Sequence, residues 1–317
     1  MPSLEHPEIA PVLRRLLWLA SFWPRLDSFA PLMHRRLVSF LTRVTSPRAA
    51  FQVDETTQKI GPDGLLVRIF HPRGHDGLLP ALLYLHGGGW TSGSSADFRP
   101  FTAMLAEESR CVVYSLDYRL APEHPFPHAL GDVATAWTWL LSHHSGAGSV
   151  PIIIGGDSAG GNLAAVFCRR LRDQGVAQPH GQFLLYPVTS SKQDTPSYQR
   201  YAQGLVLTRP MMDYFFGHYL GQAPDAASSA DVSPLHAADL SGLPPAFLGL
   251  AASDVLLDEG LAYAQAMRQA NVAVEVQVYP DMIHGFLNLL AFAAPRASAK
   301  LCAHQLARLI QRTSDVP

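Results

Sequence analysis

The chain has 317 residues, of which 48% are hydrophobic and 16% are charged, against roughly 25% charged residues in an average soluble protein. This composition excludes an intrinsically disordered chain. The 24 basic and 26 acidic residues give a formal net charge of −2 and form no basic run, so we do not expect nucleic-acid binding. The length fits one large α/β domain with an accessory part as well as it fits two domains.

Cysteine content and the N-terminal sequence bear on location. Cys111, Cys168 and Cys302 lie in apolar sequence and cannot all pair, which is typical of buried thiols in a reducing compartment. The most apolar N-terminal run, residues 16–23, lacks a small-residue cleavage site. It is also far shorter than the about 20 apolar residues of a membrane span. We therefore expect a cytoplasmic protein with no signal peptide and no stable membrane insertion.

Residues 1–46 are predicted to form two amphipathic helices. Apolar side chains recur there at helical spacing in two sets, Leu13, Leu16, Leu17, Ala20 and Trp23, then Met33, Leu37, Leu41 and Val44. The segment is also rich in aromatic residues, with Trp18, Phe22, Trp23 and Phe29. Two interpretations stay open: an N-terminal helical cap over a binding site, or helices that only pack on the core.

From about residue 50 the pattern alternates between short strands and helices. Strands are predicted at 65–70, 81–85, 111–116, 150–154, 182–186, 246–250 and 274–279, and helices among them at 162–172 and 259–270. Such alternation favours the α/β class with a mainly parallel sheet. The polar, Gly- and Pro-rich segment 188–235 interrupts the pattern around a helical stretch, so we expect a cap insertion there. The catalytic domain would then comprise 47–187 and 236–317.

The sequence GGDSAGG follows a buried strand and precedes a helix. Gly156, Ser158 and Gly160 match G-x-S-x-G, the nucleophile elbow, in the strand-turn-helix context that the motif requires. A sharp turn of this kind holds the serine in a strained conformation and leaves room only for hydrogen at the flanking positions. We expect Ser158 to be the nucleophile, with Asp157 accepting a hydrogen bond that braces the turn.

The sequence HGGG, residues 86–89, ends the strand at 81–85. Acyl transfer places negative charge on a carbonyl oxygen, which preorganised backbone N–H groups stabilise best. Consecutive glycines allow such groups to point inward without obstruction by side chains. The predicted oxyanion donors are the N–H groups of Gly87, Gly88 and Ala159.

A serine nucleophile needs a histidine base and a carboxylate, which follow in the order Ser, Asp or Glu, His in this architecture. His284 has the right order and lies in a loop after the strand at 274–279. Asp254 directly follows the strand at 246–250 and is our predicted acid. The alternatives are Asp258 and Glu259, which the dipole of a beginning helix explains, and Asp281, which we expect only to shape the turn before His284.

The segment YRLAPEHPFP, residues 118–127, carries no group that this mechanism requires. Its prolines are expected to fix a loop beneath the site, and Arg119 is expected to pair with Glu123. His124 and His128 have the spacing of a metal pair on a helix. The prolines between them forbid that helix and no third ligand is evident, so we expect no metal and no cofactor.

The motifs HGGG, DYRLAPEHPFPHAL, GDSAGGNLA, SPL, DVLLDEG and HGF occur in this order over residues 86–286. Together they resemble the hormone-sensitive-lipase family of α/β-hydrolases, the bacterial HGGG carboxylesterases. The resemblance implies an eight-stranded, mostly parallel sheet with a helical cap, and hydrolysis of short- to medium-chain acyl esters. It also implies Ser158, Asp254 and His284 as the triad, and a possible homodimer. The chain departs from the family pattern at Val255, where proline is usual.

These residues predict a serine carboxylesterase that acts on small ester molecules through an acyl-enzyme. Two alternatives use the same fold. A binding protein of the gibberellin-receptor type resembles this family without the catalytic histidine, whereas His284 is present here. A serine peptidase or amidase would usually carry an additional specificity domain, for which the chain leaves no length.

Overall fold

A computed structural model describes residues 8–22, 25–46, 50–75, 77–144 and 147–314. Its centre is one eight-stranded sheet in the order β1-β2-β4-β3-β5-β6-β7-β8. The strands are β1 Val53–Ile60, β2 Leu65–Pro72, β3 Ala81–Leu85, β4 Val112–Asp117, β5 Ile152–Asp157, β6 Gly181–Leu185, β7 Ala246–Ser253 and β8 Val274–Ile283. β2 pairs antiparallel with β1 and β4, and all other pairs are parallel. The predicted α/β class and the eight-stranded, mostly parallel sheet are confirmed.

Seven of the strands were predicted from apolar runs, and β1 was not. Its sequence VDETTQKI is polar apart from its ends, and only Val53 and Ile60 are buried. β1 lies at the edge of the sheet, where it pairs on one side only. An edge strand with little buried surface needs no apolar run, so hydrophobic periodicity cannot detect it.

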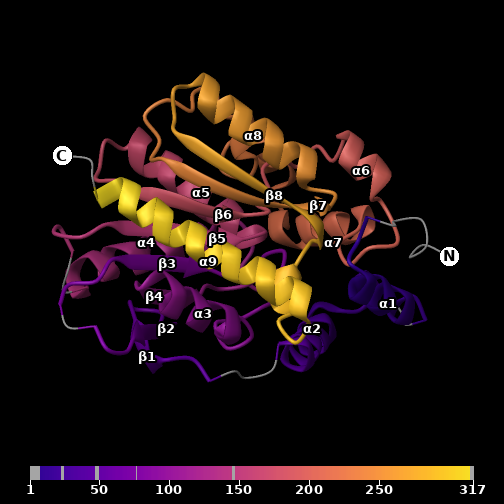
Figure 1. Cartoon of the computed structure of the whole chain (residues 1–317). Helices are drawn as coiled ribbons and strands as arrows, with labels where there is room; N and C mark the ends of the chain where they lie inside the picture. The colour runs from indigo at the N-terminus through magenta and orange to yellow at the C-terminus, as the bar shows by residue number, and fades with distance from the viewer. Residues whose placement is uncertain (1–7, 23–24, 47–49, 76, 145–146, 315–317) are drawn as a thin grey trace.

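Helices cover both faces of the sheet (Figure 1). α3 (Arg99–Ser109) and the C-terminal α9 (Ala293–Ser314) pack together over one face. α4 (His128–His143), α5 (Ala159–Asp173) and α8 (Leu257–Gln269) lie on the other. The parallel strands are therefore buried on both sides, which explains their nearly continuous apolar sequences.

Two segments add helices beyond this layered core. The N-terminal segment contributes α1 (Pro11–Ala20), η2 (Leu26–Ser28) and α2 (Pro31–Thr45), and the segment between β6 and β7 contributes α6 (Pro196–Arg200), α7 (Arg209–Leu220), η3 (Pro224–Ser228) and η4 (Pro234–His236). A further short turn, η5 (Phe286–Asn288), follows β8. Figure 1 shows α1, α2, α6 and α7 at the same end of the molecule. Both predicted N-terminal helices and the predicted helix of the insertion are present.

The N-terminal helices pack differently from each other. On α1 the predicted apolar face is the packed one, because Leu13 and Leu17 are buried. On α2 the apolar set faces outward: Met33, Leu41 and Val44 are exposed, while the opposite side of the helix, with His34 and Thr42, is buried. Trp23 lies outside the described residues. The Arg35 guanidinium donates hydrogen bonds to the carbonyls of Thr91 and Ala121 at 2.5 and 2.6 Å. These bonds fix the orientation of α2, so its apolar side chains point outward.

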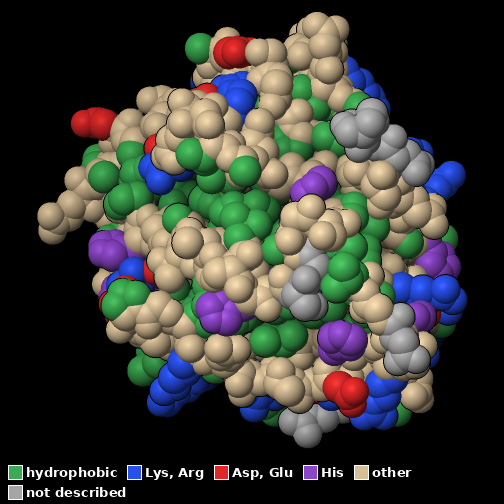
Figure 2. All heavy atoms as spheres, turned by 90° about the vertical axis from the view of Figure 1, so that its left-hand side faces the viewer, with side chains coloured by type: hydrophobic (Ala, Val, Ile, Leu, Met, Phe, Trp, Pro, Cys, Tyr) green, Lys and Arg blue, Asp and Glu red, His purple; other side chains and the backbone are tan. Residues whose placement is uncertain are grey.

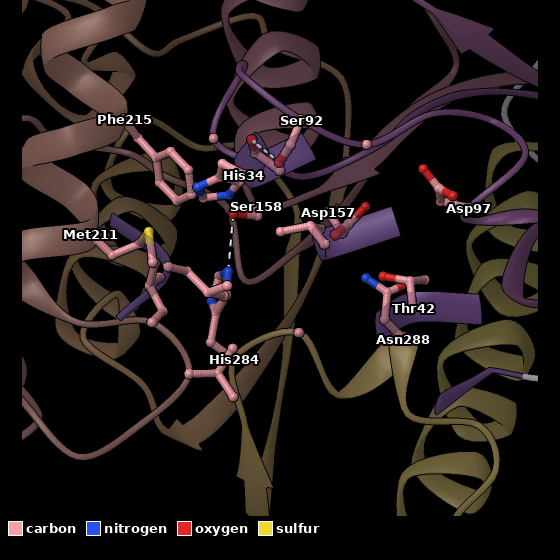
Figure 3. Close-up of a pocket in the computed structure, with 18 of the residues that line it drawn as sticks. His34, Thr42, Ser92, Asp97, Asp157, Ser158, Met211, Phe215, His284 and Asn288 are labelled. Carbon is pink, nitrogen blue, oxygen red and sulfur yellow. Dashed lines mark hydrogen bonds between the residues drawn. The ribbon is translucent and has the colours of Figure 1, made fainter. Parts of the chain in front are cut away.

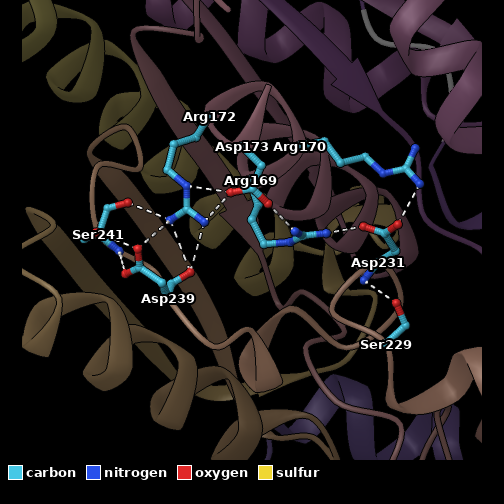
Figure 4. Close-up of polar contacts among 8 residues, drawn as sticks. All are labelled: Arg169, Arg170, Arg172, Asp173, Ser229, Asp231, Asp239 and Ser241. Carbon is cyan, nitrogen blue, oxygen red and sulfur yellow. Dashed lines mark hydrogen bonds and ion pairs between the residues drawn. The ribbon is translucent and has the colours of Figure 1, made fainter. Parts of the chain in front are cut away.

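Arginines on α5 attach the end of the insertion to the core (Figure 4). Arg169 and Arg170 both bond the Asp231 carboxylate, the latter at 2.6 Å. Arg172 donates to the Ser241 carbonyl at 2.6 Å. Partial burial alone would raise the pKa of Asp231, but the two guanidinium groups lower it below its usual value. Asp231 is therefore ionised and holds the chain as it returns towards β7.

The three cysteines are free and buried, as predicted. Among the described residues, no helix combines the length and the apolarity of a membrane span.

The face that lies at the left of Figure 1 carries charged side chains of both signs, scattered around its rim with hydrophobic groups between them (Figure 2).

Glu259 is buried, which the helix dipole alone does not explain. Its Oε1 atom accepts hydrogen bonds from the amides of Thr189 and Ser190 at 2.6 and 3.0 Å. These bonds fasten the chain beyond β6 to the start of α8. Burial raises the pKa of Glu259 to about 8, against the opposing effect of the two amides.

This raised pKa predicts a pH-dependent stability. The pKa of Glu259 in the folded protein exceeds the value of about 4.3 in an unfolded chain. The contribution of Glu259 to the free energy of unfolding is therefore greatest below about pH 4.3. It is lost as the pH rises towards 8. Glu259→Gln keeps an oxygen acceptor but cannot ionise. We therefore expect urea midpoints at pH 5 and pH 8 to differ less in Glu259→Gln than in the wild type. Asp225→Asn, at an exposed site, is the control and should behave as the wild type; an unchanged pH dependence in Glu259→Gln would contradict the assignment.

Candidate active site

Ser158 lies in a sharp turn between β5 and α5. Its φ and ψ are 52° and −119°, a left-handed conformation that is strained for a residue with a side chain. A Cβ atom on Gly156 or Gly160 would lie 2.2 or 1.9 Å from the Leu85 carbonyl oxygen. Only glycine fits at these two positions, so the steric reason for the G-x-S-x-G pattern is present in the structure.

His284 and Asp254 reach Ser158 from neighbouring strands. His284, in the turn after β8, places Nε2 at 3.0 Å from Ser158 Oγ (Figure 3). Its Nδ1 lies 2.7 Å from Oδ2 of Asp254, which follows β7. The other oxygen of Asp254 accepts the Leu256 amide at 3.0 Å, and the carboxylate is buried. The three residues selected from the sequence thus form one continuous hydrogen-bonded chain.

The carboxylates of Asp258 and Glu259 bond other groups, and the bond at Asp281 is made by its backbone. Asp258 accepts the Ser197 amide at 2.7 Å and holds the start of α6. Glu259 bonds the chain beyond β6, as described above. The Asp281 backbone carbonyl accepts the Ala10 amide at 3.0 Å. None of these three contacts involves the imidazole of His284.

The HGGG turn differs from the sequence prediction at one position. The amide of Gly87 donates to Asp157 Oδ1 at 2.8 Å, so the prediction that it faces an oxyanion is wrong. The amides of Gly88 and Gly89 have no acceptor among the described residues, and both glycines line the same pocket as Ser158. Ala159 is the first residue of α5, so its amide has no partner within the helix. The available donors are therefore Gly88, Gly89 and Ala159.

Both of these glycines are required by their surroundings. Gly88 and Gly89 have φ values of 113° and 59°, which glycine adopts without steric cost. A Cβ atom on Gly88 would lie 2.2 Å from the Ser92 carbonyl oxygen, and one on Gly89 would lie 2.2 Å from the ring of Phe215 on α7. The turn that carries the free amides is thus packed directly against the insertion.

Asp157 braces the two motifs against each other. Its Oδ1 accepts hydrogen bonds from Gly87 N and from the hydroxyl of Tyr84, the latter at 2.7 Å. Burial raises its pKa to about 6, while these two bonds act in the opposite direction. The expected bracing role is confirmed. Tyr84 was missed because a tyrosine inside an apolar strand is indistinguishable from a core residue.

A cavity of about 130 Å³ opens over Ser158 and His284. Leu26 and Val38 of the N-terminal segment and Val206, Met211 and Phe215 of the insertion line its apolar part. Thr42, Asp97 and Asn288 gather at its opposite, polar end (Figure 3). The cavity therefore has an apolar side and a polar side, and both added segments contribute to its walls. Trp18, Phe22 and Phe29, three aromatic residues of the N-terminal segment, are not among the residues that line this cavity.

His34 of α2 also lines the cavity and was not identified from the sequence. It is buried and stacks on Tyr214 of α7 with the ring centroids 5.2 Å apart. Burial lowers its pKa, so the ring is neutral near pH 7. No motif marks it, because its role depends on which side of α2 faces the pocket.

The loop before α4 forms ion pairs other than the expected one. Arg119 bonds Asp132 at 2.5 Å, and Glu123 instead accepts Arg35 of α2 at 2.9 Å. The predicted Arg119–Glu123 pair is therefore wrong; the partner Arg35 comes from a segment whose position the sequence does not specify. Among the described residues, no group of three or more His, Cys, Asp or Glu side chains is placed to hold a metal ion.

Comparison with known proteins agrees with this arrangement. Residues 82–288 match a family model described as the alpha/beta hydrolase fold. The chain is 39% identical over 261 residues to carboxylic ester hydrolase LipN of Mycobacterium tuberculosis, covering 80% of this chain and 69% of LipN. It is 34% identical over 305 residues to carboxylesterase NlhH of the same species, covering 94% of each.

Solved structures are similar over nearly the whole chain. A crystal structure of a variant of LAE6, an alpha/beta hydrolase enzyme from the metagenome of Lake Arreo, Spain, has a TM-score of 0.88 and 34% identity. The match covers 95% of this chain and 98% of LAE6. Together with the ordered motifs and the geometry around Ser158, these matches show that the chain belongs to the carboxylesterases of the hormone-sensitive-lipase family of α/β-hydrolases.

Proposed function

We propose that this protein hydrolyses short- to medium-chain acyl esters with Ser158 as nucleophile, His284 as base and Asp254 as the orienting acid. The observation that carries the proposal is the hydrogen-bonded chain from Asp254 through His284 to Ser158 Oγ. The hydrogen bond between His284 and Ser158 favours an enzyme over a binding protein that has the same fold but lacks the histidine. The names of the relatives LipN and NlhH support ester hydrolysis.

The acylation step follows from these contacts. Neutral His284 accepts the Ser158 proton at Nε2 while Oγ attacks the ester carbonyl carbon. The amides of Gly88, Gly89 and Ala159 stabilise the oxyanion of the tetrahedral intermediate. The His284 imidazolium then donates this proton to the leaving oxygen as the C–O bond of the ester breaks, and the alcohol leaves. Asp254 holds the imidazole in the required tautomer and stabilises the imidazolium.

Deacylation repeats the sequence with water. His284 accepts a proton from a water molecule that attacks the acyl-Ser158 carbonyl, and the same three amides bind the second oxyanion. Collapse of this intermediate returns the proton to Ser158 Oγ and releases the carboxylic acid. Side chains, backbone amides and water supply every group that these steps use.

The size of the cavity supports the acyl-chain range. Its volume of about 130 Å³ is close to that of an engineered cavity of about 150 Å³ that binds benzene. A short acyl group fits such a space, whereas a long chain must extend beyond it. We propose that residues 1–46 and 188–235 together form a cap, because α2 and α7 supply walls of this cavity.

Location and assembly belong to the same proposal. The free buried thiols support a cytoplasmic protein. The outer edge of β8 forms one end of the sheet, which supports a homodimer formed through that strand. The substrate partner is a small ester molecule.

The proposed nucleophile can be tested by removing its hydroxyl. Ser158→Ala removes the attacking oxygen, so kcat for p-nitrophenyl butyrate should fall by about six orders of magnitude. The thermal midpoint should stay near that of the wild type, since only one hydroxyl is lost. Ser142→Ala, at an exposed position of α4, is the control. A purified Ser158→Ala protein with a tenth of the wild-type turnover would exclude this serine.

Two neighbouring carboxylates, Asp254 and Asp258, can be separated by substitution. Asp254→Asn should lower kcat by roughly four orders of magnitude, because the amide favours the wrong imidazole tautomer. Asp258→Asn should instead weaken the bond to Ser197 and lower the thermal midpoint with little change in kcat. Both variants are compared at equal folded fraction. A larger loss of kcat in Asp258→Asn would contradict the assignment of the acid.

The cavity walls should limit the length of the acyl chain. On p-nitrophenyl esters from acetyl to palmitoyl, kcat/KM should peak at roughly four to eight carbons, as in the family this chain resembles. Met211→Ala enlarges the cavity and should shift the peak towards longer chains. Met33→Ala, on the outward side of α2, should leave the peak in place. Equal profiles for Met211→Ala and the wild type would show that α7 does not limit the acyl chain.

A further inference from the structure

Helix α2 exposes the apolar side chains that would normally be buried. Its outward stripe consists of Met33, Leu37, Phe40, Leu41 and Val44, spaced as on one face of a helix. Leu37 is half-buried and the other four are exposed. Phe40 and Val44 are 62% and 60% exposed. The opposite side of the helix, with His34, Val38 and Thr42, lines the catalytic cavity. The helix is thus amphipathic with its apolar stripe towards solvent.

Exposed apolar groups are concentrated in this part of the molecule. Of the fourteen large hydrophobic residues that are exposed among the described residues, eight lie between positions 18 and 44. Three of them, Trp18, Leu19 and Phe22, belong to α1 or directly follow it. A solvent-exposed apolar stripe on an ordered helix marks an interaction site.

The charge of this surface identifies the kind of partner. Neither α1 nor α2 contains an acidic residue, and Arg15, Arg36 and Arg43 are exposed on them. Arg43 has a weak pairing with the buried Asp97 at 3.7 Å. Basic groups beside a row of apolar side chains are typical of helices that lie in the interface of an anionic lipid surface.

A second copy of the chain fits this surface less well. In a twofold dimer the same face meets itself, so the arginines of one α2 would approach a surface that offers no acidic residue from α1 or α2. Like charges across an interface oppose association. An anionic lipid surface provides opposite charge along the whole stripe.

We propose that the outward stripe of α2, defined by Met33, Leu37, Phe40, Leu41 and Val44, docks the protein on anionic lipid surfaces. The inward side of the same helix lines the cavity over Ser158. Docking therefore holds the cavity close to the interface in which apolar esters dissolve. Such docking is a property of the outer surface of α2 and does not depend on ester turnover.

The test is co-sedimentation of the full chain with sucrose-loaded vesicles of phosphatidylglycerol or phosphatidylcholine at low and high salt. We expect binding to phosphatidylglycerol that weakens at high salt. Phe40→Ser/Val44→Ser should reduce the partition coefficient at least about tenfold, because two apolar side chains are no longer buried in the interface. Arg36→Gln should reduce it about fivefold. Leu301→Ser, at a 55% exposed position of α9, is the matched control and should bind as the wild type.

Several outcomes would overturn the proposal. The first is that the wild type does not bind phosphatidylglycerol. The second is that it binds both lipids equally and Arg36→Gln has no effect. The third is that Phe40→Ser/Val44→Ser and Leu301→Ser reduce binding equally. A dimer in analytical ultracentrifugation that Phe40→Ser/Val44→Ser dissociates would assign the stripe to a second copy instead. Thermal midpoints establish that each variant is folded. Failure of the wild type to hydrolyse p-nitrophenyl acetate would count against the proposed function and would not change the binding result.

Discussion

The turn at Ser158 is the constraint on which the rest of the site depends. Its left-handed backbone is possible only because Gly156 and Gly160 approach the carbonyl oxygen at the end of β3 more closely than any side chain allows. This close approach joins the turn at Ser158 to the strand that leads into the HGGG turn. Asp157 then accepts a hydrogen bond from Gly87 in that turn. One steric requirement therefore fixes the positions of both Ser158 and the nearby backbone amides of the HGGG turn.

Much of this site can be predicted from sequence because its residues lie at the ends of strands. Parallel strands end at one edge of the sheet, so His284 and Asp254 meet Ser158 wherever the intervening helices have ordinary lengths. The direction of an individual amide cannot be predicted in this way. Gly87 and Gly88 are equivalent in the sequence, and it is the structure that distinguishes them, through the bond from Gly87 to Asp157.

The N-terminal segment shows a second limit of prediction from sequence. Periodicity identifies α2 as an amphipathic helix but does not reveal which side meets the protein. Here the bonds of Arg35 to Thr91, Ala121 and Glu123 determine the orientation, and each partner lies far away in the sequence. The same helix consequently serves two environments, with the cavity on its buried side and solvent on its apolar side. One helix thus lines the cavity and carries the stripe proposed to attach the protein to a lipid surface.

The central claim, that Ser158 attacks ester carbonyls, can be tested directly by covalent labelling. A p-nitrophenyl alkylphosphonate reacts with an activated serine and releases one p-nitrophenol for each site modified. Mass spectrometry of the intact protein should show one phosphonyl group per chain, and peptide mapping should locate it on Ser158. Pre-incubation with a substrate ester should slow the labelling. A label on any other residue, or no label under conditions in which the protein hydrolyses p-nitrophenyl butyrate, would contradict the account.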